Sequence, residues 1–272
     1  MRARIAFHVT CALIALAALA PVLWVLKMSL ITRGELFASP PTLLPKHLTL
    51  SHYDTIFGDP DFRRGVLNSV LIASVTTVAA LILGGLAAYP LARLRFRGRT
   101  FLMTGILALA FFPTVAILAP LFVEFRDLQI LNSYLAVILV DTVFALPLTV
   151  WILTAFFRQL PPDLEDAAKV DGATTLQAFR MVIVPLAAPG VVTAGILSFI
   201  FAWNEFLFAN TFLFDPAHWP VTVVIPNFAT QHTIDYGAQA AAAIAVTVPL
   251  AVLVLVFQRR IVSGLTAGAV KG

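Results

Sequence analysis

The sequence predicts an all-α polytopic membrane protein with six transmembrane helices. Hydrophobic residues make up 60% of its 272 residues and charged residues only 12%, which is about half the charged fraction of a typical soluble domain. Several apolar runs are long enough to cross a hydrocarbon layer about 30 Å thick, for which a helix needs about 20 residues. Because backbone polar groups in lipid must be paired within the segment, these runs are predicted to be helices.

The six predicted spans follow one another along a single transmembrane domain, residues 1–272. They are Ile5–Leu26, Val66–Tyr89, Thr100–Val123, Ser133–Phe157, Gly190–Phe212 and Gly237–Phe257. The first run also has features of a secretory signal peptide, since two arginines precede it and residues 18–20 have the small-x-small form. Its apolar stretch is long for a signal peptide, which favours a retained helix.

The distribution of positive charge predicts the orientation. With a cytoplasmic N-terminus, twelve of the 18 lysines and arginines lie on the inner side and six on the outer side, as the positive-inside rule requires. This arrangement makes 158–189 and the tail 259–272 cytoplasmic, and it makes 32–65 and 213–236 external loops. The alternating arginines of 93–99 are the strongest anchor, and a loop near anionic headgroups is sufficient to account for them.

Several classes of site are not expected. Cys11 is the only cysteine, and the five histidines are scattered along the chain, so neither a disulfide nor a metal site is predicted. The net charge of +4 follows the membrane topology and does not indicate a nucleic-acid partner.

A polar segment between the fourth and fifth spans is predicted to form two short helices. Pro162 can open the first helix because proline is tolerated in a first turn. The acidic residues of 163–166 then lie near the positive end of that helix, where carboxylates are favourable. Asp171-Gly172 predicts a turn, a threonine at 174 or 175 can cap the second helix, and later prolines end it.

This segment resembles the EAA motif of permease subunits of bacterial ABC importers, E-A-A-x3-G-x9-I-x-L-P. The matching positions are Asp166, Ala167, Ala168, Gly172, Val182, Val184 and Pro185. Asp replaces the motif's Glu and is one methylene shorter, while Val replaces both Ile and Leu. The run Trp203-Asn204-Glu205-Phe206 and the ending from Gly264 are similar to the second inner-membrane subunit of maltose-type and trehalose-type sugar importers.

The resemblance implies an ABC importer type I permease fold, with 158–189 as a cytoplasmic coupling-helix hairpin. It implies a heterodimer with a second permease subunit, embedded in the lipid of the bacterial inner membrane. It also implies two copies of a cytoplasmic ATPase and an extracytoplasmic solute-binding (lipo)protein as partners. The substrate would be a di- or oligosaccharide such as trehalose or maltose. This chain lacks a Gly-x4-Gly-Lys-Ser/Thr loop, so ATP and Mg²⁺ would be bound by the partner ATPase. No catalytic residue and no cofactor are expected in the chain itself.

The resemblance also implies candidate residues for each contact. The ATPase-coupling residues are Glu165, Asp166, Ala167, Ala168, Asp171, Gly172, Phe179 and Pro185, and the tail contacts are Gly264, Gly268 and Lys271. Polar residues in the spans are costly in hydrocarbon, so Asp141, Asn204 and Glu205, with the neighbouring Trp203, are candidates for the substrate pathway. Interhelical polar contacts are the alternative role for them.

Other functions remain open at this stage. The same architecture could carry another solute, such as a glycerol phosphodiester or an oligopeptide. An ion-coupled secondary transporter is often built from inverted repeats, and no convincing repeat is found here. A membrane-embedded enzyme would need a convergent catalytic cluster, which the scattered histidines do not provide. The sequence does not identify the sugar.

Overall fold

The computed structural model describes residues 2–40, 44–228 and 235–267, and this part of the chain is helical. One isolated antiparallel bridge joins Ile31 and Leu48. The α-helices are α1 (Arg2–Leu30), α2 (Arg33–Leu36), α3 (Ser51–Gly58), α4 (Pro60–Arg93), α5 (Arg99–Leu109), α6 (Thr114–Asp127), α7 (Tyr134–Gln159), α8 (Asp163–Val170), α9 (Thr175–Ala178), α10 (Val184–Leu186), α11 (Ala188–Trp203), α12 (Leu207–Phe212), α13 (Val221–Val224) and α14 (Tyr236–Ala267). A π-helix, η1 (Phe179–Ile183), and two 3₁₀ turns, η2 (Pro216–His218) and η3 (Ile225–Phe228), complete the described elements.

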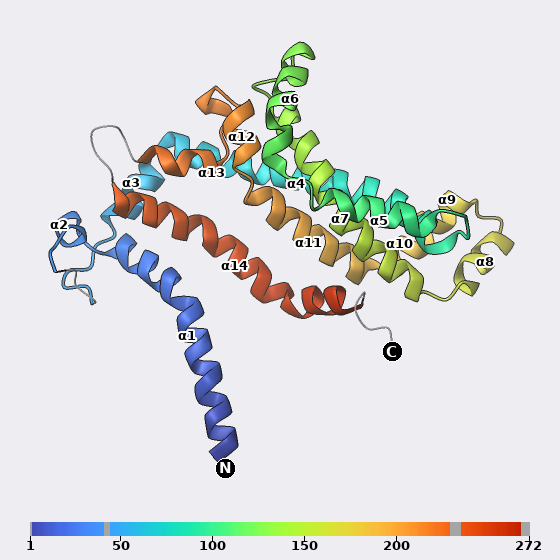
Figure 1. Cartoon of the computed structure of the whole chain (residues 1–272), viewed down its shortest axis with the longest axis horizontal. Helices are drawn as coiled ribbons and strands as arrows, with labels where there is room; N and C mark the ends of the chain where they lie inside the picture. Colours follow the sequence, from blue (N-terminus) through green and yellow to red (C-terminus); the bar gives the residue numbers. More distant parts are fainter. Residues whose placement is uncertain (1, 41–43, 229–234, 268–272) are drawn as a thin grey trace.

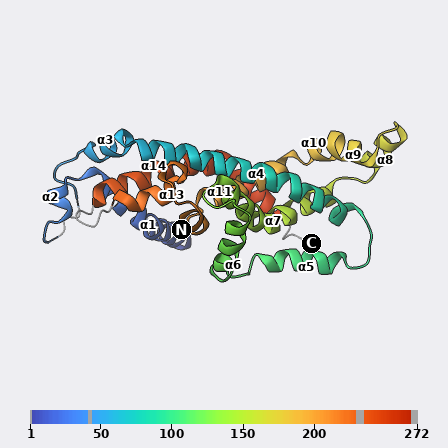
Figure 2. The ribbon, with the colours of Figure 1, turned by 90° about the horizontal axis from the view of Figure 1, so that it is seen from above.

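The centre of the molecule is formed by α4, α7 and α11, which pack against one another. Helix α14 packs against α11 of this central group, and α1 packs in turn against α14. Figures 1 and 2 show α8 and α9 projecting at one end of the long axis, with α2 and α3 at the opposite end. The hairpin carrying the motif therefore lies at one end of the bundle.

Small residues allow the central helices to approach closely. A Cβ on Gly84 of α4 would lie 2.6 Å from Thr149 Cγ2 on α7. A Cβ on Gly190 of α11 would lie 2.4 Å from the ring of Phe156 on α7. The hydroxyls of Thr149 and Ser198, 2.9 Å apart, add a hydrogen bond between α7 and α11. Apolar helices associate in lipid through close packing of small residues and interhelical hydrogen bonds. The hydrophobic effect does not drive this association, because the lipid tails are as apolar as the helix surfaces.

Within the described residues, four helical segments are long and apolar enough to cross a membrane unaided. They are Arg4–Leu30, Pro60–Arg93, Tyr134–Gln159 and Tyr236–Val262. Two further segments are bent pairs: Arg99–Leu109 with Thr114–Asp127, at 86°, and Thr175–Leu186 with Ala188–Trp203, at 80°. Counting each pair as one gives six spans, so the predicted all-α polytopic class is confirmed.

The predicted third span, Thr100–Val123, is wrong as a continuous helix. The chain leaves α5 after Leu109 and enters α6 at Thr114, with Pro113 extended at the N-cap. Proline offers no N–H to continue the helix and disfavours helical geometry in the residue before it. The break therefore follows from Pro113, which stands within the apolar run of the predicted span.

The predicted fifth span, Gly190–Phe212, is also interrupted. Helix α11 ends at Trp203, and the side chain of Glu205 then accepts hydrogen bonds from the backbone N–H groups of Phe208 and Ala209, at 2.7 and 3.0 Å. This carboxylate caps the short helix α12, because the first N–H groups of a helix have no partner within it. At the other end of the chain, α14 continues as a helix beyond the predicted end of the sixth span at Phe257.

The segment from Leu213 to Phe228 is tied to α4. Asn68 Nδ2 donates to the carbonyl oxygens of Ala217 and Trp219, at 3.0 and 2.9 Å. Ser69 Oγ accepts the N–H of Val221 at 2.9 Å. These bonds and the buried Val221 and Val224 make this part of the predicted external loop 213–236 an ordered cap over the bundle.

Candidate functional site

The polar segment forms two short helices that meet at Gly172, as the sequence predicted. Helix α8 ends at Val170, and Gly172 takes φ of +88°, a backbone geometry in which an L side chain is strained. Thr174, one of the two predicted caps, then starts α9. Its hydroxyl accepts the N–H of Gln177 while the Gln177 side chain accepts the N–H of Thr174, a capping box that fixes the start of α9.

One face of this hairpin points away from the bundle. Of the predicted coupling residues, Asp166, Ala167, Asp171, Gly172 and Pro185 are exposed, and Ala168 is half-buried.

Large apolar side chains of the hairpin are exposed as well. Val170 is 87% exposed, Met181 71% and Leu176 65%. Exposed apolar residues grouped beside polar ones are typical of a protein-binding surface. The hairpin therefore carries the features of a docking element.

Glu165 lies on the opposite face of α8 and is buried. The Tyr89 hydroxyl on α4 donates a hydrogen bond to Glu165 Oε1, and Lys169 Nζ lies 2.9 Å from the same oxygen. Arg93 Nε lies 3.7 Å from Oε2. Burial alone raises the pKa of Glu165, but the hydrogen bonds from Tyr89 and Lys169 and the charges of Lys169 and Arg93 outweigh it and hold that pKa below its ordinary value.

Phe179 also faces the bundle. Its ring centroid lies 5.0 Å from that of Tyr89 on α4 and 5.8 Å from that of Phe157 on α7. It opens the π-helix η1, a local widening that is frequent at functional positions. Glu165 and Phe179 thus attach the hairpin to the ends of two central helices.

Sequence reasoning missed Tyr89 and Arg93 as parts of this site. In the sequence, Arg93 contributes to the positive charge that predicts the topology, and Tyr89 stands at the end of a predicted span. Their spacing of four places both on one face of α4, which was the available signal. The position of that face relative to Glu165 depends on how α8 folds back.

Within the described part of the chain, no hydrogen bond or ion pair joins the candidate pathway residues to one another. Asp141 is wholly buried on α7, and neither carboxylate oxygen has a hydrogen-bond partner among the described residues. Trp203 is buried and stacks on Phe199 at a centroid distance of 5.7 Å. Glu205 caps α12, as described above. Asn204 is exposed and donates to the carbonyl of Ile200 at 2.7 Å.

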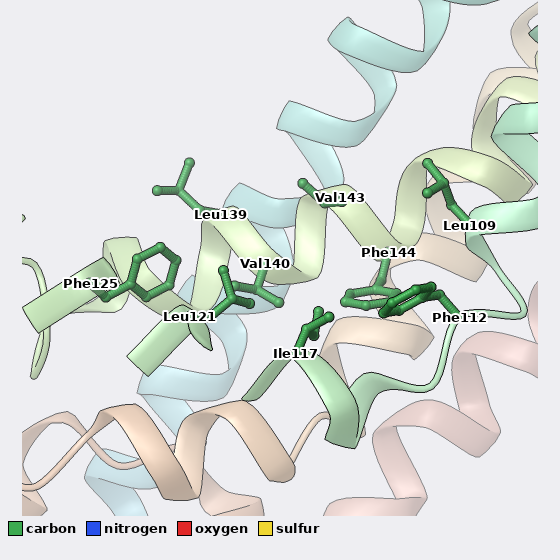
Figure 3. A pocket seen from close by; sticks show the side chains of 9 residues that line it. All are labelled: Leu109, Phe112, Ile117, Leu121, Phe125, Leu139, Val140, Val143 and Phe144. Carbon is green, nitrogen blue, oxygen red and sulfur yellow. The ribbon is translucent and has the colours of Figure 1, made fainter. Parts of the chain in front are cut away.

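A cavity of about 430 Å³ lies where the broken third span meets α7. Figure 3 shows its nine lining side chains, which come from the end of α5, the turn after it, α6 and α7. All are hydrocarbon: Leu109, Phe112, Ile117, Leu121, Phe125, Leu139, Val140, Val143 and Phe144. A sugar site needs polar groups in fixed positions, so this cavity does not fit a sugar.

The predicted tail contact is described only in part. Gly264 belongs to α14, which runs to Ala267. Gly268 and Lys271 lie outside the described residues. Among the described residues no group of three or more His, Cys, Asp and Glu side chains converges to hold a metal ion.

A bundle of apolar helices with a projecting, bundle-anchored hairpin defines the membrane permease class of transport protein. The chain belongs to the family described as the binding-protein-dependent transport system inner membrane component, which matches residues 80–266.

Two curated relatives align over nearly the whole chain. The trehalose transport system permease protein SugB of Mycobacterium tuberculosis is 46% identical over 94% of this chain and 93% of its own. The trehalose/maltose transport system permease protein MalG of Thermococcus litoralis is 37% identical over 99% and 97%.

A solved structure has the same fold. It belongs to a bacterial ABC transporter involved in import of the acidic polysaccharide alginate, and it aligns with a TM-score of 0.80 at 24% identity, over 94% of this chain and 95% of that one. This match confirms the importer-permease fold expected from the motif.

Proposed function

We propose that this chain is one permease subunit of an ATP-driven sugar importer and that the α8–α9 hairpin couples it to a separate ATPase. The observation that carries the proposal is the two-sided hairpin. Its outer face exposes Val170, Leu176 and Met181, while its inner face is fastened to the bundle through Glu165 and Phe179. An element with those two faces can receive a push from a partner and pass it to the spans.

The transmission begins at the contacts of the inner face. Glu165 joins α8 to α4 through Tyr89 and Arg93, and Phe179 joins η1 to α4 and α7. Motion of the docked hairpin therefore moves the ends of two central helices together. Closure of an ATPase dimer would draw two such hairpins toward each other and switch the pathway between inward-facing and outward-facing states.

The partners follow from the family and from the exposed surfaces. A binding-protein-dependent system implies an extracytoplasmic solute-binding protein. Two ATPase copies would bind ATP and Mg²⁺, and a second permease subunit would complete the pathway. None of the residues in the most apolar window of Arg4–Leu30 is buried, so α1 has a face available to lipid or to that second permease. The hairpin and both termini are then cytoplasmic, with the ending from Gly264 directed toward the ATPase pair.

The proposed substrate is a di- or oligosaccharide, with trehalose the first to test. The support is the name of the 46% identical relative, a trehalose permease, and that of the trehalose/maltose relative. Asn204 is the proposed pathway contact, because its side chain is exposed at the break after α11. Asp141, Trp203 and Glu205 are proposed to support the walls of the pathway.

The test is reconstitution of the chain with its partner permease, ATPase and binding protein in proteoliposomes. We expect trehalose or maltose to stimulate ATP hydrolysis and to be accumulated only when ATP is present. Glycerophosphodiesters and oligopeptides serve as the comparison solutes. Uptake driven by a proton or sodium gradient without ATP would contradict the proposal, as would stimulation by a comparison solute alone.

A further inference from the structure

A positively charged pocket lies beside the hairpin, where the α4–α5 loop, the end of α7 and the start of α8 meet. Its volume is about 420 Å³. Five cationic side chains line it against only two carboxylates, Glu165 and Asp166. The cations are Arg93, Arg95, Arg99, Arg158 and Lys169. Positive charge is therefore in excess by three on the walls of one pocket.

The arginines that line the pocket retain unused hydrogen-bond donors. Arg93 donates Nη1 to the carbonyl of Leu160 at 2.8 Å. Its Nε lies 3.7 Å from Glu165 Oε2, within ion-pair range but too far for a hydrogen bond. Neither the buried Nε nor the buried Nη2 has a hydrogen-bond acceptor among the described residues. Arg99 Nε is also buried without an acceptor in the described part of the chain. The Arg93 side chain is only 10% exposed. Buried donors in native structures are almost always satisfied, so these atoms indicate an absent acceptor.

We propose that this pocket binds an anionic phosphate group. Guanidinium groups match phosphate oxygens with paired hydrogen bonds, and the charge on both partners strengthens each bond. A phosphate here would accept from the unused Arg93 and Arg99 donors and would compensate the excess charge. It would also join the α4–α5 loop to α8, because Glu165, Asp166 and Lys169 of that helix share the same pocket.

The surroundings of the pocket are compatible with a lipid headgroup as the source of the phosphate. Leu94 and Phe96 beside the arginines are 52% and 40% exposed, and Phe101 is 80% exposed. Apolar side chains interleaved with arginines are typical of a segment that lies at the membrane interface. A soluble phosphate compound offers the same chemistry, and the experiment distinguishes the two sources.

The same loop supplies a matched control. Arg97 is exposed and does not line the pocket, whereas Arg95 is exposed and does. Arg95→Gln and Arg97→Gln remove the same charge from the same loop, one inside the pocket and one outside it. Arg99→Gln removes one of the unused donors directly. Because Arg95 is at the surface, its substitution keeps the test valid if the Arg99 variant fails to assemble.

The experiment uses the assembled transporter purified in detergent. The affinity for the first bound phosphatidylglycerol is measured by native mass spectrometry, with phosphatidylcholine as the zwitterionic comparison. Binding of radiolabelled inorganic phosphate is measured by equilibrium dialysis. We expect Arg95→Gln and Arg99→Gln each to weaken binding of one of these anions by about tenfold, since a charged hydrogen bond is lost. Arg97→Gln should change it less than about twofold.

The outcomes separate the sources and can overturn the proposal. If Arg95→Gln and Arg99→Gln weaken the binding of phosphatidylglycerol alone, the ligand is a lipid headgroup. If they weaken the binding of inorganic phosphate alone, the ligand is a soluble phosphate. An equal loss from Arg97→Gln shows only diffuse attraction by the loop and overturns the pocket. No loss with either probe overturns it too. Binding to the permease pair that disappears when the ATPase is added shows that a protein side chain fills the site, which also refutes the proposal. None of these outcomes depends on the transported solute.

Discussion

Replacing Tyr89 with phenylalanine tests the attachment of the hairpin most directly. The substitution removes only the hydroxyl that donates to Glu165, and it keeps the ring that packs 5.0 Å from Phe179. Glu165 is 9% exposed at its side chain, so solvent cannot fully replace the lost donor. Hydrogen bonds to charged groups contribute about 1.5–3 kcal/mol. We therefore expect opening of α8 from α4 to become easier by about ten- to a hundredfold.

Hydrogen–deuterium exchange of the assembled complex measures this opening. The backbone amides of α8 should exchange faster in Tyr89→Phe, because local opening free energies set their protection. The coupling ratio, sugar moved per ATP hydrolysed, should fall in the same variant. Tyr134→Phe is the matched control, since that hydroxyl donates to Asn68 Oδ1 at 2.9 Å outside the hairpin. Unchanged exchange in α8 with Tyr89→Phe, or an equal effect of Tyr134→Phe, would refute the reasoning.

Three further predictions concern the hairpin and the packing of the bundle. Gly172→Val should cost about 1–3 kcal/mol of local backbone strain and uncouple ATP hydrolysis from transport. Gly98→Val, at φ of +90° in the α4–α5 loop, should strain the backbone equally and leave coupling intact. Coupling is measured as sugar-stimulated ATPase activity, and equal uncoupling by both variants would contradict the coupling role of the hairpin. The lowered pKa of Glu165 means that its ionised form stabilises hairpin attachment at neutral pH and that this contribution is lost as pH falls through the folded-state pKa. Exchange of α8 should therefore accelerate on acidification, and Glu165→Gln should abolish that pH dependence; persistence of the same pH profile in the variant would disprove it. Gly190→Ala should lower the free energy of unfolding by about 1–3 kcal/mol, because its Cβ would meet the Phe156 ring at 2.4 Å. Gly105→Ala in α5 meets nothing within 4 Å and should be neutral or slightly stabilising. Equal melting temperatures for the two variants would contradict this prediction and show that α11 can shift.

The continuous spans were predictable because hydrophobic length is local information. A run such as Tyr134–Gln159 is apolar enough to cross the bilayer whatever surrounds it. The breaks were not predicted, although Pro113 and Glu205 were visible in the sequence. Proline is common in membrane helices without breaking them, and the capping role of Glu205 requires knowing where α12 begins.

The motif residues divide in a way that sequence could not reveal. Asp166 and Gly172 lie on the exposed side of the hairpin, as a docking role requires, whereas Glu165 is turned toward Tyr89 and Arg93. Adjacent helical residues such as Glu165 and Asp166 point in different directions. Which of them meets the bundle depends on how α8 is oriented against α4.

The sequence by itself determined the helical membrane class and the turn at Gly172, because hydrophobic run length and backbone preference act within a few residues. It also carried the motif that placed the chain in its family. Only the tertiary structure decided that Glu165 and Phe179 anchor the hairpin, that the third and fifth spans are interrupted, and that the loop arginines converge with α8 on one pocket. Each of these depends on side chains far apart in the chain being brought within a few ångströms, which no local pattern specifies.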